Sequence, residues 1–398
     1  MDNKKNINTI DSAQKHKIQH SVFLIRNVAP EKFGGGETYQ LKLAAELKSH
    51  GFSPAILTNS KELLARAKSE GIKTYLPPYI ENQIWSGLKN FLLPAYFVKL
   101  KAQQRWYEAL FKRERPSVIN VQSRDDWLSA TLAARCVGNI KILWTDHADF
   151  RNWVLWNLDK PLKNPIGKKI AKLSRIIDKL IFISQYEKNW FTSFPQTKHQ
   201  KNLVIVPNGV KDEFEKYRNI KSEKNSFIYL GRIVEEKGIS TLLKAFKKVS
   251  KEFSDARLNL YGDGPDLARY CVETKAFKNI HFHGETANPI ESLAKNQIFV
   301  LPSYREGLSL SLLEAAMMQK TIIATNIDGN PEVVEDKKSG LLVPPKDPAA
   351  LAAAMQKLLK DPNLAKSLAR NARQTYEEHF DLDRIFDEQM LPLYNNDK

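Results

Sequence analysis

The segment "LPSYREGLSLSLLEAAMMQ", residues 301–319, holds the pattern on which the predicted fold depends. It begins as the end of an apolar strand, turns at Pro302, and continues as an apolar helix. A buried strand followed directly by a helix is the repeating unit of parallel sheets that helices cover on both faces. The segment also carries two carboxylates, Glu306 in the turn and Glu314 in the helix.

Short apolar runs alternate with helix-like segments from residue 20 to residue 360. The runs are rich in β-branched residues and end in turn residues, as buried strands do. This alternation predicts an α/β protein with parallel sheets. The predicted strands are 21–28, 53–58, 117–122, 140–145, 179–184, 203–209, 226–231, 256–264, 279–284, 297–303 and 320–326.

The charged segment 210–226 interrupts the alternation, and we interpret it as a linker. It divides the chain into two predicted doubly wound, Rossmann-like domains, 20–210 and 211–376, that face each other across a cleft. In such sheets ligands bind at the C-terminal ends of the strands. Residues 1–19 are polar and typical of a disordered tail, and the end of the chain, about 377–398, is helix-like.

The composition is typical of a globular protein, with 42% hydrophobic and 27% charged residues among 398. No apolar run approaches the roughly 18 residues that a membrane span needs, and the first twenty residues lack the apolar centre of a secretory signal. Cys136 and Cys271 do not have a metal-binding spacing. We therefore expect a cytoplasmic protein without a metal site, in which both cysteines are inert core residues.

The excess positive charge lies in the N-terminal half. Residues 1–210 contain 33 Lys and Arg against 17 Asp and Glu, whereas the rest contains 28 of each, so the first part carries the whole net charge of +16. Such a field favours an anionic partner, which could be a membrane surface, an acidic acceptor or nucleic acid. A lysine-rich, solvated surface is the simpler alternative.

Two loops after predicted strands are rich in glycine or in cations. In "APEKFGGGETYQL" (29–41), glycines precede a helix whose N–H groups could contact a phosphate or a sugar, although a tight turn would need glycine as well. In "GRIVEEKG" (231–238), Arg232 and Lys237 could hold a diphosphate between them. The two glutamates in that loop could instead make these cations ordinary surface ion pairs.

Histidines follow two other predicted strands. His147, in "WTDHADF" (144–150), could bond a sugar hydroxyl or act as an acid or base, although a lone histidine is more often structural. His281 and His283 share a strand face in "NIHFHG" (279–284). A metal pair is conceivable there, but no nearby carboxylate or cysteine completes a site, so we expect none.

The loop in the opening segment, from Glu306 to Ser309, runs into a helix N-terminus and so forms a possible anion site. Glu314 lies inside that helix, where a buried carboxylate is costly unless it is hydrogen-bonded. The two hydroxyls of a ribose would satisfy it, and so would a backbone amide or a lysine.

Taken together, these loops resemble those of the retaining glycosyltransferases of family 4, which have the GT-B fold. The resemblance covers residues 20–360 and rests on "GGGE", "TDHAD", "PNGV", "GRIVEEKG", "YGDGP", "HFHG" and "LPSYREGLSLSLLEA", in the family's order. The combination of GR…EKG with E-x7-E is specific, whereas each fragment alone is not. The chain departs from the family's usual turns at Lys320 and at Asn330.

The resemblance implies a role for each candidate residue. Arg232 and Lys237 would bind the donor diphosphate, Glu314 the ribose and Glu306 the hydroxyls of the transferred sugar. His147 would contact that sugar near the reacting carbon, and the last helix would return to the N-terminal domain. Further donor contacts would come from Gly35, Gly36, Gly307, Leu308, Ser309, His281 and Phe282, with the base read by backbone around 280–284.

The implied reaction moves a hexose-type sugar from a nucleotide diphosphate sugar, with UDP favoured, to a hydroxyl of a glycan or glycolipid acceptor in cell-surface polysaccharide biosynthesis. The anomeric configuration would be retained, with the leaving diphosphate helping to take the acceptor proton. Catalysis would rest on His147, Glu306, Arg232 and Lys237. The two cations would stabilise the leaving group, so no metal and no cofactor is expected.

Two basic segments, 83–115 and 163–179, lie in the predicted acceptor domain. The first mixes aromatic residues with lysine and arginine, as helices at a bilayer interface do. Either the protein contacts the inner face of the cytoplasmic membrane, or the aromatic residues pack on the sheet beneath solvated cations. We find no nucleic-acid-binding signature, and no motif specifies an oligomeric state.

Three other functions fit parts of the pattern. A protein that binds nucleic acid or another anionic surface would use the basic half alone. A non-catalytic sugar-nucleotide-binding subunit would keep Arg232, Lys237 and Glu314 but lose the region around His147, which this chain retains. A sugar-nucleotide epimerase on the same fold would bind a donor and need no acceptor.

Overall fold

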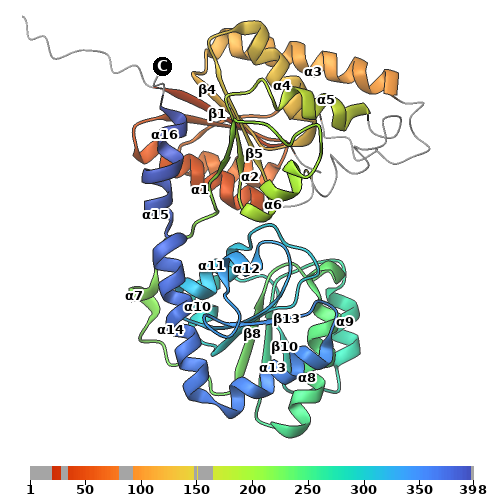
Figure 1. The fold of residues 1–398 in the computed structure, drawn as a ribbon, viewed down its shortest axis with the longest axis vertical. Coiled ribbons are helices and arrows are strands. Elements are labelled where there is room, and N and C mark those ends of the chain that lie inside the picture. The colour runs from red at the N-terminus through yellow and green to blue at the C-terminus, as the bar shows by residue number, and fades with distance from the viewer. Residues whose placement is uncertain (1–19, 28–34, 80–92, 148–149, 151–164, 396–398) are drawn as a thin grey trace, which may run out of the picture.

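The structure, a computed structural model, describes residues 20–27, 35–79, 93–147, 150 and 165–395. The described chain forms two parallel sheets with helices on both sides, one in each half of the molecule (Figure 1). The predicted α/β class is therefore confirmed, and so are the predicted strands. Two short strands, β3 (Lys73–Tyr75) and β13 (Leu341–Val343), were not predicted.

The N-terminal sheet has the strand order β3-β2-β1-β4-β5-β6-β7 in the described residues. The order reverses between β1 and β4, and ligands of open α/β sheets bind at such a switch point. The other strands are β1 (Ser21–Ile25), β2 (Ser53–Leu57), β4 (Val118–Val121), β5 (Lys141–Asp146), β6 (Lys179–Phe182) and β7 (Leu203–Ile205). The helices are α1 (Gly35–Ser49), α2 (Lys61–Ser69), α3 (Leu93–Glu114), α4 (Arg124–Val137), α5 (Pro165–Leu173) and α6 (Gln185–Thr192).

The C-terminal sheet has the order β10-β9-β8-β11-β12-β13 in the described residues. Its other strands are β8 (Ser226–Leu230), β9 (Arg257–Tyr261), β10 (Ile280–Phe282), β11 (Ile298–Leu301) and β12 (Thr321–Thr325). The helices are α7 (Phe214–Tyr217), the 3-10 helix η3 (Glu235–Lys237), α8 (Ile239–Glu252), α9 (Leu267–Thr274), α10 (Pro289–Ala294), α11 (Leu310–Met317), α12 (Asn330–Val333), α13 (Pro348–Lys360) and α14 (Pro362–His379).

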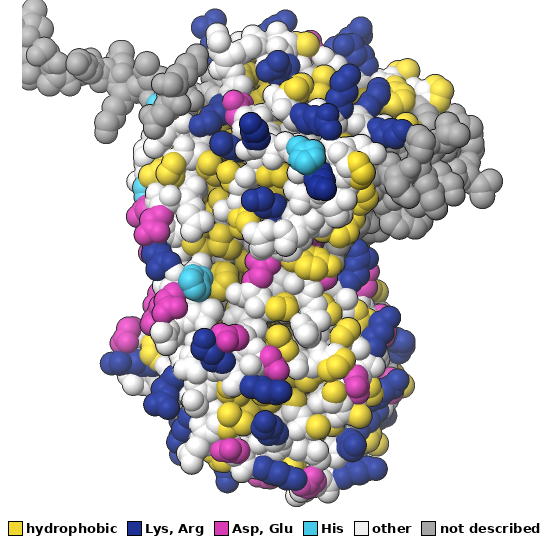
Figure 2. All heavy atoms as spheres, in the orientation of Figure 1, with side chains coloured by type: hydrophobic (Ala, Val, Ile, Leu, Met, Phe, Trp, Pro, Cys, Tyr) yellow, Lys and Arg dark blue, Asp and Glu magenta, His cyan; other side chains and the backbone are white. Residues whose placement is uncertain are grey.

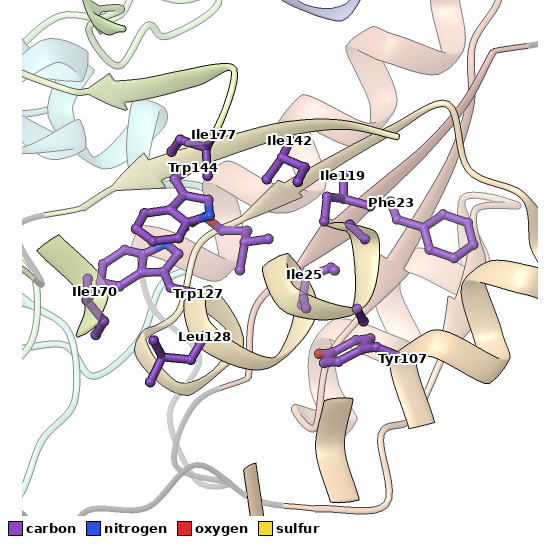
Figure 3. Close-up of a cluster of buried hydrophobic side chains, with 14 of the residues drawn as sticks. Phe23, Ile25, Tyr107, Ile119, Trp127, Leu128, Ile142, Trp144, Ile170 and Ile177 are labelled. Atoms are coloured by element: carbon purple, nitrogen blue, oxygen red, sulfur yellow. Dashed lines mark hydrogen bonds between the residues drawn. The ribbon is translucent and has the colours of Figure 1, made fainter. Parts of the chain in front are cut away.

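Stacked aromatic rings fill the core between the N-terminal sheet and helix α4. Trp127 of α4 lies against Trp144 of β5 with ring centroids 5.6 Å apart (Figure 3). Phe150 stacks on Trp127, with centroids 4.4 Å apart. Both indole N–H groups are satisfied, one by the Val121 carbonyl and the other by the Thr131 hydroxyl. Because buried, hydrogen-bonded indoles have little freedom, this stack fixes the C-terminal ends of β4 and β5.

The last helices leave the C-terminal domain and pack on the N-terminal one, as the resemblance implied (Figure 1). A parallel bridge joins Val210 to Asp381 where the two chain segments cross. Beyond it, α15 (Leu382–Ile385), the π-helix η4 (Phe386–Met390) and α16 (Leu391–Tyr394) place apolar side chains in the core beneath β1.

The segment predicted as a linker belongs partly to the C-terminal core. Tyr217 of α7 is buried there, and its hydroxyl accepts a hydrogen bond from Asn288. The expectation that both cysteines are core residues is wrong, because Cys136 and Cys271 are exposed. Each cysteine lies on the exposed face of an amphipathic helix, Cys136 on α4 and Cys271 on α9. None of the described helices is long and apolar enough to cross a bilayer.

Removing the Tyr394 side chain should destabilise the N-terminal domain, although it lies at the far end of the chain. Tyr394 is fully buried, and its hydroxyl accepts a hydrogen bond from Asn120 at 2.6 Å. We expect Tyr394→Ala to lower the free energy of unfolding by about 3–5 kcal/mol. All seven tryptophans lie before residue 191, so tryptophan fluorescence in urea reports this domain.

Tyr186→Ala is the matched control, since that side chain is 37% exposed. Tyr186→Ala should lower the free energy of unfolding by well under half as much as Tyr394→Ala does. Equal losses in the two variants would contradict the docking of the last helix.

Candidate functional site

Backbone packs on backbone where strands β8, β9 and β10 end. A Cβ atom on Gly262, whose φ is +136°, would lie 1.9 Å from the Gly231 carbonyl oxygen. The Gly262 N–H also donates to the Gly284 carbonyl at 2.7 Å. Only glycine allows this approach. The surface at these strand ends is therefore formed by glycine backbone without side chains, here called the glycine floor, and a ligand can approach it closely.

Lys237 and Glu306 meet across two neighbouring loops. Lys237 Nζ donates to Glu306 Oε1 at 2.6 Å, and the Ser303 hydroxyl donates to the same oxygen at 2.7 Å. The two charged side chains are only 19% and 7% exposed, respectively. Gly238, with φ +71°, allows this contact, because a Cβ there would lie 1.9 Å from the Pro302 carbonyl oxygen. A largely buried pair of this kind is held by its hydrogen bonds.

Asp328, which the sequence analysis did not single out, fixes the backbone of Glu306. Its Oδ2 accepts the Glu306 N–H at 2.9 Å. Asp328 has a positive φ of 48°, a conformation that aspartate adopts more readily than most residues. Beside it, a Cβ on Gly329 would lie 2.1 Å from the Gly307 carbonyl oxygen. The loop after β12 therefore supports the loop after β11.

Arg232 is exposed beside this pair, and in the described part of the chain no carboxylate forms an ion pair with it. Its carbonyl accepts the Tyr229 hydroxyl at 2.8 Å, which anchors the loop while leaving the guanidinium accessible. Glu235 bonds Tyr270 and Arg269 instead. The alternative of simple surface pairs within the loop is therefore wrong for Lys237 and Arg232.

The loop from Gly307 to Ser309 leads into α11. Leu308 is buried, and its carbonyl accepts a hydrogen bond from Asn208 of the interdomain segment at 3.0 Å. Ser309 stands at the N-cap of α11 without a side-chain capping bond, so it leaves the first amides of the helix to other acceptors. The donor contacts predicted for Gly307, Leu308 and Ser309 stay predictions, and the Leu308 side chain belongs to the core.

Glu314 is half-buried on α11 and faces the other domain. Burial raises the pKa of its carboxyl to about 7, while Lys42 of α1 lowers that pKa and Glu213 raises it. Glu314 and Glu306 therefore lie in different environments, one near the domain boundary and the other against Lys237. A carboxyl that titrates near neutral pH is a good acceptor for paired hydroxyls and a poor partner for an anion.

Arg26, just after β1, and Glu37, in the first turn of α1, form an ion pair. Arg26 Nε donates to Glu37 Oε1 at 2.9 Å, and the side chains are 12% and 5% exposed. A Cβ on Gly36 would lie 2.4 Å from the guanidinium, so a larger residue there would have to displace the Arg26 side chain. A Cβ on Gly35 would come within 4.0 Å of Leu310, which brings the starts of α1 and α11 together.

His147 lies at the end of β5, next to this ion pair. Its Nε2 is 3.3 Å from Gln122 Oε1, and its ring meets that of Tyr39 edge-on with centroids 4.7 Å apart. Burial, and then the charge of Arg26, hold the pKa of His147 well below its usual value. The imidazole is therefore neutral at physiological pH. Asp149, the second flanking aspartate, lies outside the described residues.

The side chains of His281 and Phe282 lie apart from this group, and the donor contacts predicted for these two residues stay a prediction. Their side chains point to opposite faces of β10, and Phe282 packs against the core. His281 lines a separate cavity of about 610 Å³, together with Asn259, Tyr261 and His283. Among the described residues, no cluster of three or more potential ligands could hold a metal ion.

A carboxylate from the C-terminal domain caps a helix of the N-terminal domain. Glu332 Oε2 accepts the Gln185 N–H at 2.9 Å and Glu332 Oε1 accepts the Tyr186 N–H at 2.8 Å. These amides are the first of α6, where a helix has unpaired donors and a partial positive charge. The contact ties the two domains together beside the candidate site.

Two family models match adjacent parts of the chain. The model described as Glycosyltransferase Family 4 matches residues 33–214, and the model described as Glycosyl transferases group 1 matches residues 210–375. The two matches meet next to α7, where the chain passes from one sheet to the other.

Individual relatives align along most of the chain. It is 25% identical over 310 residues to the capsular polysaccharide biosynthesis glycosyltransferase CapM of Staphylococcus aureus, covering 72% of this chain and 78% of CapM. It is 25% identical over 365 residues to the D-rhamnosyltransferase WbpZ of Pseudomonas aeruginosa, covering 87% and 79%. The Anabaena HepE structure in complex with UDP and glucose superposes with a TM-score of 0.72 at 15% identity, covering 94% of this chain and 99% of HepE.

Glu314→Gln should remove a loss of stability that the native chain undergoes between about pH 5 and 8. Because the folded pKa of about 7 lies above the unfolded value, the folded state binds the proton more tightly. The stabilisation is complete below the unfolded pKa and is lost as the pH rises through 7, by at most about 1.4 kcal/mol per pH unit. The uncharged variant should not show this loss.

Urea unfolding followed by circular dichroism at pH 5, 6, 7 and 8 measures the difference. The exposed Glu335→Gln is the control and should keep the native pH slope. A Glu314→Gln variant with that same slope would show that the carboxyl is not perturbed.

Proposed function

We propose that this chain, which belongs to the glycosyltransferases of group 1, transfers a hexose-type sugar from a nucleotide diphosphate sugar to a hydroxyl of a glycan or glycolipid. The reaction would retain the anomeric configuration and serve the synthesis of a cell-surface polysaccharide. The observation that carries the donor assignment is the accessible guanidinium of Arg232 beside the Lys237–Glu306 pair, above a floor of glycine backbone.

The names of the relatives support the pathway and the donor class. CapM is named for capsular polysaccharide biosynthesis, and the HepE structure holds UDP and glucose. A UDP-sugar is therefore the donor that we favour. The backbone around 280–284 would read the base, because Gly284 joins the glycine floor while the His281 side chain points to another cavity.

The proposed reaction breaks the bond between the anomeric carbon and the diphosphate oxygen. The acceptor oxygen forms its bond to that carbon on the same face, and its proton passes to the leaving diphosphate. Arg232 and Lys237 stabilise the negative charge that grows on the leaving group, and Glu306 keeps Lys237 in place. Since two fixed cations do this work, the proposed reaction needs no metal ion.

The roles of the two glutamates follow from their surroundings. Glu306 is fixed by Ser303, Lys237 and the Asp328 contact to its backbone, so its carboxylate has one orientation from which to bind hydroxyls of the transferred sugar. Glu314 has no such fixing contact to the donor loops and is the group proposed to bind the ribose. Because the Glu306 carboxylate is already held in place, it needs little reorganisation to accept hydrogen bonds from hydroxyls.

We further propose that the N-terminal domain adsorbs to an anionic membrane surface through charge. Three aromatic side chains of α3, Tyr96, Tyr107 and Phe111, are buried in the core, and Phe97 and Trp106 are partly buried against it, so these rings are not free to enter a bilayer. Cations remain on the outside, and Figure 2 shows them gathered over this domain. The exposed basic surface of α3 and α5 consists of Lys101, Arg105, Lys112, Arg113, Lys169 and Lys172.

Replacing Arg232 and Lys237 together with alanine should lower kcat by a factor of at least about 1,000, since each cation is worth roughly 100-fold or more in the transition state. The measurement is sugar transfer from a UDP-sugar, after thermal-shift screening of UDP-, GDP- and ADP-sugars to choose the donor. Activity of the native chain should persist in EDTA.

Lys251 and Arg370 supply the matched control, because they are an exposed lysine and an exposed arginine of the same domain. Their double alanine variant should keep full activity. Transfer by the Arg232/Lys237 variant at the rate of this control would rule out the proposed diphosphate site.

Reversing four charges of the basic surface should abolish binding to vesicles. We expect the native chain to float with liposomes containing anionic lipid, and less so as salt rises, because the attraction is screened within about 8–10 Å. The variant carries glutamate at Lys101, Arg105, Lys169 and Lys172. Its control carries glutamate at four exposed lysines of the other domain: Lys248, Lys251, Lys357 and Lys366.

We expect the control variant to float with the liposomes and the charge-reversed variant of α3 and α5 not to float. Equal flotation of the two, or none by the native chain at moderate salt, would refute membrane binding through this surface.

A further inference from the structure

Gln122 is a buried amide at the switch point of the N-terminal sheet, and the sequence analysis gave it no role. It directly follows β4 and has no exposed surface. Its backbone N–H donates to the Ile25 carbonyl at 2.8 Å, and its carbonyl accepts from Arg26 Nη1 at 3.0 Å. Because both backbone groups are bonded to the end of β1, the side chain has a fixed origin and extends along the α1 face of the sheet.

The amide of Gln122 meets the imidazole of His147 on the next strand. Its Oε1 lies 3.3 Å from His147 Nε2. An amide oxygen can only accept a hydrogen bond, so the contact requires the proton on Nε2. The ring is neutral, because burial and the charge of Arg26 lower the pKa of His147. A neutral imidazole has one N–H, and Nδ1 is then left with its lone pair.

The nitrogen of the same amide, Gln122 Nε2, indicates that a ligand binds here. Gln122 Nε2 has no hydrogen-bond partner among the described residues, although the residue is fully buried. Buried polar atoms are nearly always paired. This donor lies beside His147 at the switch point of the sheet, where ligands of such folds bind, and that position favours an atom that binds there during function. An oxygen of the substrate is the partner of the right chemistry.

We propose that Gln122 is a positioning residue for His147: its amide oxygen holds the imidazole with the proton on Nε2, so that Nδ1 accepts a hydrogen bond from a hydroxyl group of the substrate. This inference rests on the proposed function. It also separates the two kinds of contact, since an ionised diphosphate has no proton to donate to Nδ1. His147 then recognises sugar hydroxyls, and the cations of the other domain bind the phosphates.

The charges around His147 agree with this assignment. Arg26 approaches from the end of β1, and Glu37 of α1 forms an ion pair with Arg26. Tyr39 of α1 contributes the edge of an aromatic ring. Asp146, the preceding residue on β5, points to the opposite face and accepts the Phe150 N–H. None of these contacts supplies a proton acceptor at Nε2 in the described structure, which leaves that role to Gln122.

The tautomer of His147 is the direct test, and it needs no activity. Long-range nitrogen–proton correlation spectra of the full chain, labelled with ¹⁵N-histidine, distinguish the two neutral forms. His147→Asn identifies the signal among the eight histidines. We expect the form protonated on Nε2 at neutral pH. A ring protonated on Nδ1, or an imidazolium, would overturn the proposal.

Variants of Gln122 then test the consequence. Gln122→Leu should mix the two tautomers and lower kcat by roughly tenfold to a hundredfold, the usual effect of losing an orienting group. Gln122→Glu places a carboxylate next to Nε2, which should raise the pKa of His147 and shift the acid limb of the pH–rate profile upward. The native tautomer and native kcat in Gln122→Leu would contradict a positioning role.

Gln103 provides the control, because it is also a buried glutamine without side-chain partners, 2% exposed and on α3. Gln103→Leu should keep the native tautomer and pH profile. If the native chain transfers no sugar, the proposed function fails while the tautomer result still stands. If transfer is normal but the ring is protonated on Nδ1, the role of Gln122 alone fails.

Discussion

The contact between Lys237 and Glu306 organises the candidate donor site, because it joins the loops that follow β8 and β11. Both side chains are mostly buried, and a buried charge is tolerated only where its partners are fixed. The surrounding features supply that fixing: Ser303 bonds the carboxylate, Asp328 holds the Glu306 backbone, and Gly238 permits the close approach of the two loops. The exposed guanidinium of Arg232 is the second cation of this site, on a loop that the Tyr229 hydroxyl anchors.

The fold and family could be predicted from the sequence, because both depend on local signals. Strand–helix alternation and loop motifs were sufficient, and the family is confirmed. The strands β3 and β13 were missed because three residues give too little periodicity. Arg26, Gln122 and Asp328 were missed for another reason. Their importance comes from partners that are close in space and far along the chain, and no spacing in the sequence indicates such contacts.

The two domains contribute different chemistry to the space between them. The C-terminal domain supplies accessible cations and bare backbone, which suit phosphates. The N-terminal domain supplies a neutral imidazole, an amide and an internally paired Arg26–Glu37, which suit hydroxyls. The excess positive charge of the N-terminal half therefore lies mostly outside its candidate site. The exposed faces of α3 and α5 carry a large share of it, and this separates recognition of the substrate from any attraction to a surface.

The short segment from Asp328 to Glu332 links two events that are usually considered apart. At one end it holds the backbone of Glu306, and at the other it caps α6 of the opposite domain. Only three residues lie between the two contacts. A rotation that drew the domains apart would pull on this segment and so disturb the loop that carries Glu306. Any separation of the two domains would therefore also change the position of the loop that carries Glu306.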